Sequence, residues 1–195
     1  MPFEFSPGEI QGVTIVDPTI FEDRRGHLMV TYQQDQFRDA GIETEFIQDK
    51  QSLSKGGVLR GLHYQRGEHS QAKLVRCDAG EVLDVVVDIR KPSPTFGNYS
   101  SRILSEENNR MVYLPRGLAH GFLVLSDTAR IHYKIDNHYA PEYEAGIAWD
   151  DPTLDIDWPT NDPTVSEKDQ QLPTLEQARS NGLLFDEIPR TETTR

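Results

Sequence analysis

Two segments of the sequence place reactive polar side chains inside otherwise apolar runs. GVLRGLHYQ at 57–65 carries Arg60 and His63, and YLPRGLAHGF at 113–122 carries His120. Because side chains alternate along a strand, Arg60 and His63 are predicted to face opposite sides. Burying an ionisable group costs free energy unless it is paired. These residues therefore indicate either a reactive site or a satisfied core histidine beside a surface arginine.

The spacing of the histidines argues against a catalytic metal. The turn PRGLAH at 115–120 resembles one half of the metal-binding motif of cupins, which are small β-barrel proteins. The other half of that motif supplies a His-x-His pair and a glutamate, but here His63 is followed by Tyr64 and Gln65. Catalytic sites usually hold a metal through three protein ligands, so the sequence predicts no metal.

The scaffold that must position these residues is predicted to be mostly β-strand. Short β-type runs separated by Gly, Pro, Asn or Asp lie at 13–16, 27–32, 45–49, 58–64, 72–77, 82–89, 102–105, 111–115, 121–126 and 129–135. Helical character is confined to 34–41, which ends at a glycine, and to 174–182, which begins with a capping box of Thr174 and Gln177. Many closely spaced strands with little helix indicate an all-β sandwich or barrel.

The size of the chain predicts a single domain. Its 195 residues are 36% hydrophobic, which is enough apolar material for one core. We expect residues 1–195 to form one domain, in which the residues from about 150 onward are an irregular, partly helical C-terminal segment packed on the barrel.

The composition excludes several classes of protein. The net charge is −12, and residues 141–195 alone carry 13 acidic and 4 basic side chains, which disfavours nucleic acid as a partner. The single cysteine, Cys77, rules out an internal disulfide framework. No apolar run approaches the roughly 18 residues of a membrane helix, and the N-terminus lacks the pattern of a signal peptide. We therefore expect a cytoplasmic protein without a membrane partner.

Several longer segments of the sequence resemble those of a known family. They are FEDRRG (21–26), IQDKQSLSKGGVLRGLHYQ (47–65), KLVRCDAGEVLDVVVDIRKPSPTFG (73–97), LPRGLAHGFLVLSD (114–127), YAPEYEAGIAWDDP (139–152) and SEKD (166–169). In order and spacing they resemble the dTDP-4-dehydrorhamnose 3,5-epimerases. The resemblance implies a double-stranded β-helix (a cupin-like jelly roll) with a few short helices, a homodimer, and no metal or organic cofactor.

The implied reaction sets clear chemical demands. The substrate would be the dTDP-sugar dTDP-4-dehydro-6-deoxy-D-glucose, and the product dTDP-4-dehydro-L-rhamnose. Carbons C3 and C5 flank the C4 ketone, so either can lose a proton and leave an enolate. Inversion then needs a base on one face, a proton donor on the other, and a positive or hydrogen-bonding group at the enolate oxygen.

By resemblance, four residues supply that catalytic set. His63 would be the base, a role that suits imidazole because it titrates near neutral pH. Asp169 would orient His63, Tyr133 would donate the proton, and Lys73 would stabilise the enolate oxygen. Without the resemblance, Tyr133 reads as a packed strand aromatic and Lys73 as a solvated surface lysine.

The nucleotide and sugar need further contacts, which the resemblance also assigns. Arginine suits a diphosphate because its guanidinium binds two oxygens at once, and Arg60 is the best candidate. Tyr139 would stack on the thymine. The remaining implied substrate-binding residues are Arg25, Gln48, Asp49, Lys50, His120, Glu144 and Lys168.

Two positions depart from the family pattern. Val30 stands where glutamate is common, which removes a carboxylate from the binding site or its partner-chain wall. Lys50 stands where asparagine is common and replaces a two-way hydrogen-bonding amide with a donor-only cation. Three alternatives therefore stay open: an epimerase acting at C3 or C5 alone on another dTDP-4-keto-sugar, a metal-dependent cupin, and a non-catalytic sugar-nucleotide binder.

Overall fold

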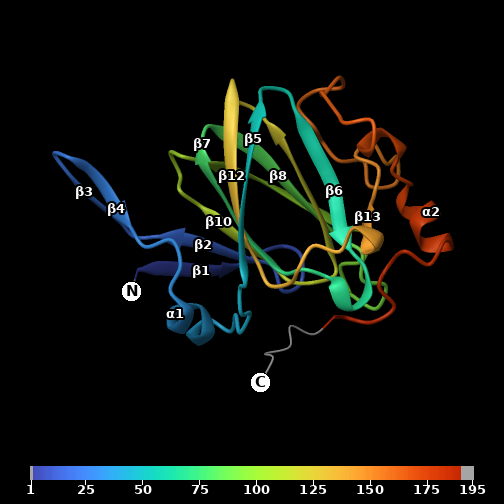
Figure 1. The fold of residues 1–195 in the computed structure, drawn as a ribbon, viewed down its shortest axis with the longest axis horizontal. Coiled ribbons are helices and arrows are strands. Elements are labelled where there is room, and N and C mark those ends of the chain that lie inside the picture. Colours follow the sequence, from blue (N-terminus) through green and yellow to red (C-terminus); the bar gives the residue numbers. More distant parts are fainter. Residues whose placement is uncertain (1, 190–195) are drawn as a thin grey trace.

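Two antiparallel β-sheets form the body of the protein (Figure 1). The structure is a computed structural model that describes residues 2–189. The six-stranded sheet has the order β1 (Phe3–Pro7), β2 (Thr14–Pro18), β10 (Met111–Leu114), β7 (Lys73–Ala79), β12 (Thr128–Ile135) and β5 (Gln48–Lys55). The five-stranded sheet has the order β13 (Glu144–Gly146), β6 (Leu59–Gln65), β11 (Leu118–Val124), β8 (Glu81–Asp88) and β9 (Tyr99–Ser105). A hairpin of β3 (Ile20–Asp23) and β4 (Gly26–Met29) projects from this body (Figure 1).

The path of the chain identifies the fold. From β7 to β8, and again from β10 to β11 to β12, the chain alternates between the two sheets. Strands that neighbour each other in a sheet are therefore mostly distant in sequence. Such alternation between two facing antiparallel sheets is the arrangement of a jelly roll. The prediction of an all-β, cupin-like jelly roll is confirmed.

The few helices are short; the two α-helices lie within the predicted ranges 34–41 and 174–182, and three single 3₁₀ turns were not predicted. They are α1 (Gln34–Asp39), α2 (Leu175–Ser180) and the single 3₁₀ turns Gly67–His69, Pro141–Tyr143 and Asp169–Gln171. The capping box before α2 is confirmed, because the Thr174 hydroxyl accepts from the Gln177 N–H and the Gln177 side chain accepts from the Thr174 N–H. This reciprocal pair satisfies amide groups that the helix itself cannot.

The sequence predicted the edge strand β5 poorly. The predicted run was 45–49, whereas the strand is Gln48–Lys55, with the polar sequence QDKQSLSK. A polar strand is possible here because β5 lies at the edge of its sheet, where outward-facing side chains reach solvent. Such a strand lacks the apolar alternation by which strands are recognised in a sequence.

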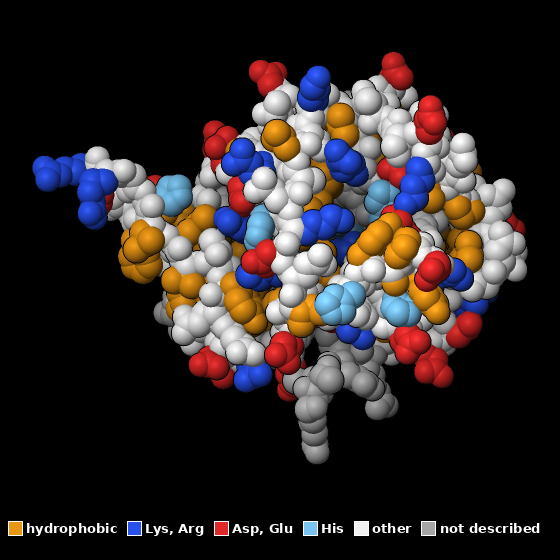
Figure 2. Space-filling view, viewed as in Figure 1, with side chains coloured by type: hydrophobic (Ala, Val, Ile, Leu, Met, Phe, Trp, Pro, Cys, Tyr) orange, Lys and Arg blue, Asp and Glu red, His pale blue; other side chains and the backbone are white. Residues whose placement is uncertain are grey.

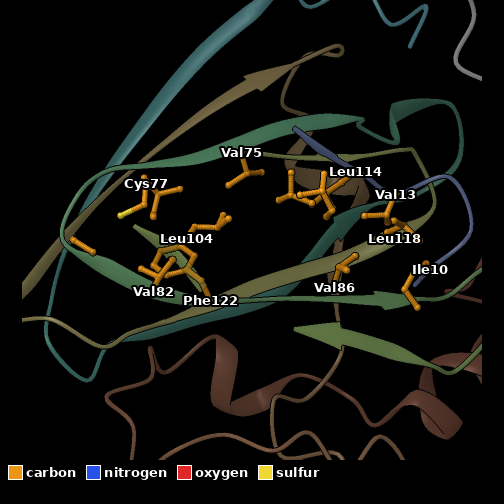
Figure 3. Packing of buried hydrophobic residues seen from close by; sticks show 14 of the residues in the cluster. Ile10, Val13, Val75, Cys77, Val82, Val86, Leu104, Leu114, Leu118 and Phe122 are labelled. Carbon is orange, nitrogen blue, oxygen red and sulfur yellow. The ribbon is translucent and has the colours of Figure 1, made fainter. Parts of the chain in front are cut away.

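Apolar side chains fill the space between the sheets and also cover the outer face of the five-stranded sheet. Figure 3 shows the inner cluster, in which Val82, Val86 and Phe122 meet residues of the opposite sheet. Each large side chain buried this way contributes about 1.5–3 kcal/mol. The outer cluster joins residues such as Val85 and Val87 to the C-terminal segment. Because β8 alternates between the two clusters, its position 84 faces inward.

Candidate active site

A cavity of about 250 Å³ opens between the two sheets, beside the inner apolar cluster. The six-stranded sheet lines it with Lys50, Ser52, Lys73, Tyr133 and Ile135, and the five-stranded sheet with Arg60, His63, Gln65, His120, Phe122 and Glu144. Gln71 and Tyr139 complete the polar lining. Figure 2 shows Lys, Arg and His side chains gathered around the hollow on this face. The cavity is suited to an anionic ligand because Glu144 is the one carboxylate among these described lining residues.

His63 on β6 forms a hydrogen-bonded pair with Asp169. The carboxylate accepts a hydrogen bond from His63 Nε2 at 2.7 Å and another from the Gly61 N–H at 3.3 Å. In the neutral imidazole the proton therefore lies on Nε2, and Nδ1 carries the lone pair. Burial acts to raise the pKa of Asp169, but the bonds from His63 and Gly61 hold it below its usual value. The pair has the construction of an oriented general base.

A β-bulge in β6 corrects the predicted faces of Arg60 and His63. His63 pairs with His120 on β11, but Arg60 pairs with Phe122, so β6 has one more residue than β11 between these two pairs. An extra residue reverses the side-chain alternation beyond the bulge. Arg60 and His63 therefore both line the cavity, and the prediction that they face opposite sides is wrong.

Gly61 allows this bulge to form. Its φ is +133°, a region that side chains rarely adopt, and a Cβ at this position would lie 2.6 Å from the Cα of Gly121. The backbones of β6 and β11 therefore approach more closely than any residue with a side chain would allow. The glycine in LRGLH is thus part of what brings Arg60 and His63 to one cavity.

Tyr133 approaches the cavity from the opposite sheet. On β12 it lies between Lys50 of β5 and Val75 of β7, and its ring packs against the inner apolar cluster. Its ring centroid is 6.2 Å from that of His120, with the two rings nearly perpendicular. Burial raises the pKa of the Tyr133 phenol well above its ordinary value, so the group is protonated at neutral pH.

Lys73, also on the six-stranded sheet, is half-buried in the cavity lining. Burial, together with the positive charge of Lys50, lowers the pKa of Lys73 to about 8, and the charges of Asp84 and Glu144 oppose that shift. At neutral pH the side chain is therefore mostly a cation, placed where it can stabilise developing negative charge.

Tyr139, Glu144 and Lys168 form a chain of contacts that reaches the edge of the cavity. The Glu144 carboxylate accepts from the Tyr139 hydroxyl at 2.6 Å and from the Lys168 ammonium at 2.7 Å. Burial acts to raise the pKa of Glu144, but these two donors hold it below its usual value. The Tyr139 side chain remains 57% exposed, which leaves it free to contact a ligand.

Besides Lys168, which reaches the cavity only through Glu144, three of the predicted binding residues lie outside the cavity lining of this chain. Arg25 is on the projecting β3–β4 hairpin, where it pairs with Asp23, and its side chain is 83% exposed. Gln48 and Asp49 are exposed at the start of β5, and Asp49 pairs with Lys134 at 2.9 Å. The single chain thus brings together the proposed catalytic set and most of the binding set, but not these residues.

Asp84 is the main residue of the site that the sequence reasoning missed. Its carboxylate is 2% exposed and accepts a hydrogen bond from His120 Nε2 at 2.6 Å. The signal was present, because LDVVVDI places a carboxylate in the middle of an apolar strand, where burial requires a partner. Ser52, Gln65 and Gln71 were also missed, and as ordinary polar residues they carry no such signal.

Two further observations concern a possible metal site and a possible membrane-spanning helix. Within residues 2–189, no three side chains among His, Cys, Asp and Glu are grouped so that they could bind a metal ion. In the same part of the chain, no helix has the length and apolar character needed to span a membrane.

A jelly roll that sets a histidine–carboxylate pair against a buried phenol and a lysine belongs to the class of cupin-like folds equipped for acid–base chemistry. The family model described as dTDP-4-dehydrorhamnose 3,5-epimerase matches residues 7–177. The chain belongs to the dTDP-4-dehydrorhamnose 3,5-epimerase family.

Relatives in sequence and structure are similar over nearly their whole length. A dTDP-4-dehydrorhamnose 3,5-epimerase of Shigella flexneri is 51% identical over 83% of this chain and 90% of its own. One from Methanothermobacter thermautotrophicus is 46% identical over 89% and 95%. A Legionella pneumophila epimerase, solved with dTDP-4-keto-L-rhamnose, superposes with a TM-score of 0.89 at 43% identity, covering 94% and 97%.

Proposed function

We propose that the protein is an isomerase that inverts C3 and C5 of dTDP-4-dehydro-6-deoxy-D-glucose, giving dTDP-4-dehydro-L-rhamnose without a cofactor. The observation that carries the proposal is the placement of His63 and Tyr133 on opposing sheets with one cavity between them. Membership of the epimerase family supports the same reaction.

The proton transfers balance at each carbon. His63 removes the hydrogen of C3 or C5 as a proton, and the electron pair of that C–H bond delocalises onto the C4 oxygen as an enolate. Tyr133 then gives its phenolic proton to the same carbon from the opposite face. The imidazolium returns its proton to solvent and the phenolate takes one up, so that no other reactant is consumed. Positioned groups of this kind are each typically worth about 10²–10⁴ in rate.

The cations of the cavity would bind the diphosphate of the substrate and stabilise the enolate that forms. Lys73 stabilises the enolate oxygen, where charge develops in the transition state. Arg60 is anchored by a 2.9 Å hydrogen bond from its Nε to Ser54, and its terminal nitrogens would bind the diphosphate. Lys50 and His120 would add contacts to the substrate. The exposed Tyr139 ring, fixed through Glu144, would stack on the thymine.

We further propose that two copies of the chain form a homodimer. The projecting hairpin exposes Phe21 at 58% and Leu28 at 73%, and the edge strand β5 exposes Leu53 at 61%. Exposed apolar residues of this size favour contact with another protein surface. In such a dimer, Arg25, Gln48 and Asp49 of one copy would contact the substrate bound in the cavity of the other copy.

The domain boundaries and the cellular setting are proposals of the same kind. Contacts of the segment from about residue 150 onward with the five-stranded sheet support one epimerase domain over 1–195. The net charge of −12 supports the absence of a nucleic-acid partner. We place the enzyme in the cytoplasm, without a membrane partner.

Incubation with the 4-keto sugar nucleotide in D₂O tests the function. Deuterium at both C3 and C5, followed by NMR, is the expected result. Deuterium at only one carbon would instead support a single-centre epimerase. A 3′-monoepimerase from Streptomyces bikiniensis is indeed similar, at 38% identity and a TM-score of 0.87. Exchange at neither carbon, with tight binding of dTDP, would refute the proposal in favour of a binding protein.

A base variant and a chelator provide the controls. His63→Ala should abolish exchange at both carbons. It should leave the affinity for dTDP nearly unchanged, because the imidazole acts on the sugar ring, which dTDP lacks. Half of the wild-type activity in this variant would refute its role as the base. Treatment with EDTA should leave turnover unchanged, and a loss that added iron or zinc restores would favour a metal-dependent cupin.

A further inference from the structure

The Lys73 ammonium lies in the cavity without a salt bridge to any residue in the described part of the chain. Two carboxylates act on it by charge, Asp84 and Glu144, but each is bonded elsewhere. Asp84 binds His120 at 2.6 Å, and Glu144 binds Lys168 at 2.7 Å. The charge state of Lys73 therefore depends on groups that do not touch it.

Asp84 is the more deeply buried of these two carboxylates. It faces inward on β8, between Val82 and Val86 of the inner cluster, and is 2% exposed. A carboxylate in such surroundings is poorly screened by solvent, so that its charge acts over a longer range than a surface charge. Among residues 2–189, His120, itself 5% exposed, is the one side chain that bonds to it. The pair sits on the sheet opposite Lys73, and both His120 and Lys73 line the cavity.

Lys50 lies on the same sheet as Lys73. It is directly opposite Tyr133 on β12, and Lys73 is opposite Ile135 on the other side of the same strand. Positions 133 and 135 share one face of β12, so both lysines point into the cavity, consistent with their place in its lining. Two ammonium groups in one partly closed cavity repel each other, and each disfavours the charged form of the other.

We propose that Asp84 and Lys50 are positioning residues for Lys73 with opposite effects: the Asp84 carboxylate holds Lys73 in its charged form, and Lys50 drives it towards the neutral form. Lys73 then loses its charge as the pH rises through about 8. The charged lysine's stabilisation of the enolate oxygen, a role that rests on the proposed function, is lost over the same pH range. Asp84 and Lys50 together would set the alkaline limit of the reaction.

Other ionisable groups line the same cavity as Lys73. By element they are Arg60, His63 and Tyr64 on β6, His120 on β11, Tyr133 on β12, Glu144 on β13, and Tyr139 in the segment after β12. The Tyr64 hydroxyl bonds instead to the Leu183 carbonyl, and Tyr133 stays neutral at neutral pH. The test must therefore change Asp84 and Lys50 one at a time and leave this background unaltered.

The experiment measures the ionisation of Lys73 directly, without turnover. Acetic anhydride acetylates only a neutral amine, so the extent of labelling of Lys73, read by mass spectrometry over a pH series, gives its midpoint. The exposed Lys55 on β5 serves as an internal reference. We expect a midpoint near 8 in the wild type. Removing one charge should move it by about one pH unit, upward in Lys50→Met and downward in Asp84→Asn.

Two outcomes would overturn the proposal: an unchanged midpoint in either variant, or shifts in the same direction. Should Asp84→Asn fail to fold, it is combined with His120→Gln, which leaves two amides able to bond to each other, and the single variant His120→Gln then serves as the reference in place of the wild type. The same downward shift is expected. The alkaline limb of kcat/KM should move with the labelling midpoint. Opposite labelling shifts in a protein without epimerase activity would support this inference and count against the proposed function alone.

Discussion

Replacing Lys73 with methionine should make the protein more stable and much less active. The cation is held in a setting that lowers its pKa from 10.5 to about 8. Each pKa unit corresponds to about 1.4 kcal/mol, so burying the charged form costs the folded state roughly 3 kcal/mol. Methionine has a similar length without the charge, and Lys73→Met should recover up to that amount at pH 7.

The gain should depend on pH in a defined direction. The folded-state pKa of Lys73 lies below the unfolded value, so the unfolded chain binds more protons between about pH 8 and 10.5. The destabilisation of the wild type is complete below pH 8 and disappears as the pH rises through this window. Urea unfolding at pH 7, 9 and 10 should therefore show an advantage of the variant that shrinks with pH.

The assay pairs this stability measurement with turnover. Loss of a group that stabilises the enolate should lower kcat by about 10²–10³. The matched control Lys55→Met, on the exposed edge of β5, should change stability by no more than about 0.5 kcal/mol and leave turnover intact. A Lys73→Met variant that is less stable than the wild type at pH 7, or whose gain in stability is the same at every pH, would contradict a destabilising charge on Lys73.

Three further predictions concern the residue that orients His63, the glycine of the β6 bulge and the arginine proposed to bind the diphosphate. Asp169→Asn should lower kcat by about 10² or more at little change in KM, because the His63 ring loses its orienting carboxylate. The ionised Asp169 also stabilises the fold at neutral pH, and this contribution is lost as the pH falls through its depressed pKa. Acid unfolding of the wild type and the variant checks this loss. Gly61→Ala should lose at least about 2 kcal/mol in thermal unfolding, because the new Cβ meets Gly121 and the φ is unfavourable; an unchanged Tm would contradict the reading of the bulge. Arg60→Met should weaken dTDP binding in calorimetry by roughly 10- to 100-fold, the value of a charge-assisted contact, and equal affinity would remove this residue from the diphosphate site.

Much of the fold could be predicted from the sequence because its signals are local. Short apolar runs between turn residues gave an all-β protein, and the capping box at Thr174 located α2. The polar edge strand β5 could not be found this way, because its side chains meet solvent on one side and the cavity on the other.

The site was harder to predict because it depends on relations between strands. Alternation along one strand placed Arg60 and His63 on opposite faces, but a single extra residue in β6 relative to β11 reversed that result. Likewise, nothing in the sequence indicates that Asp84 on β8 would bond to His120 on β11. A bulge and a cross-strand partner are properties of two strands together, and neither strand shows them alone.

We expect a sugar ring to lie between His63 and Tyr133, which act on its opposite faces. Tyr133→Phe in D₂O tests this most directly, with hydrogen exchange and stereochemistry at C3 and C5 read in the same sample. A base without its opposing donor should return deuterium to the face from which it took the proton. We therefore predict exchange with retained configuration at one carbon or both. Inversion at the wild-type rate would contradict the claim.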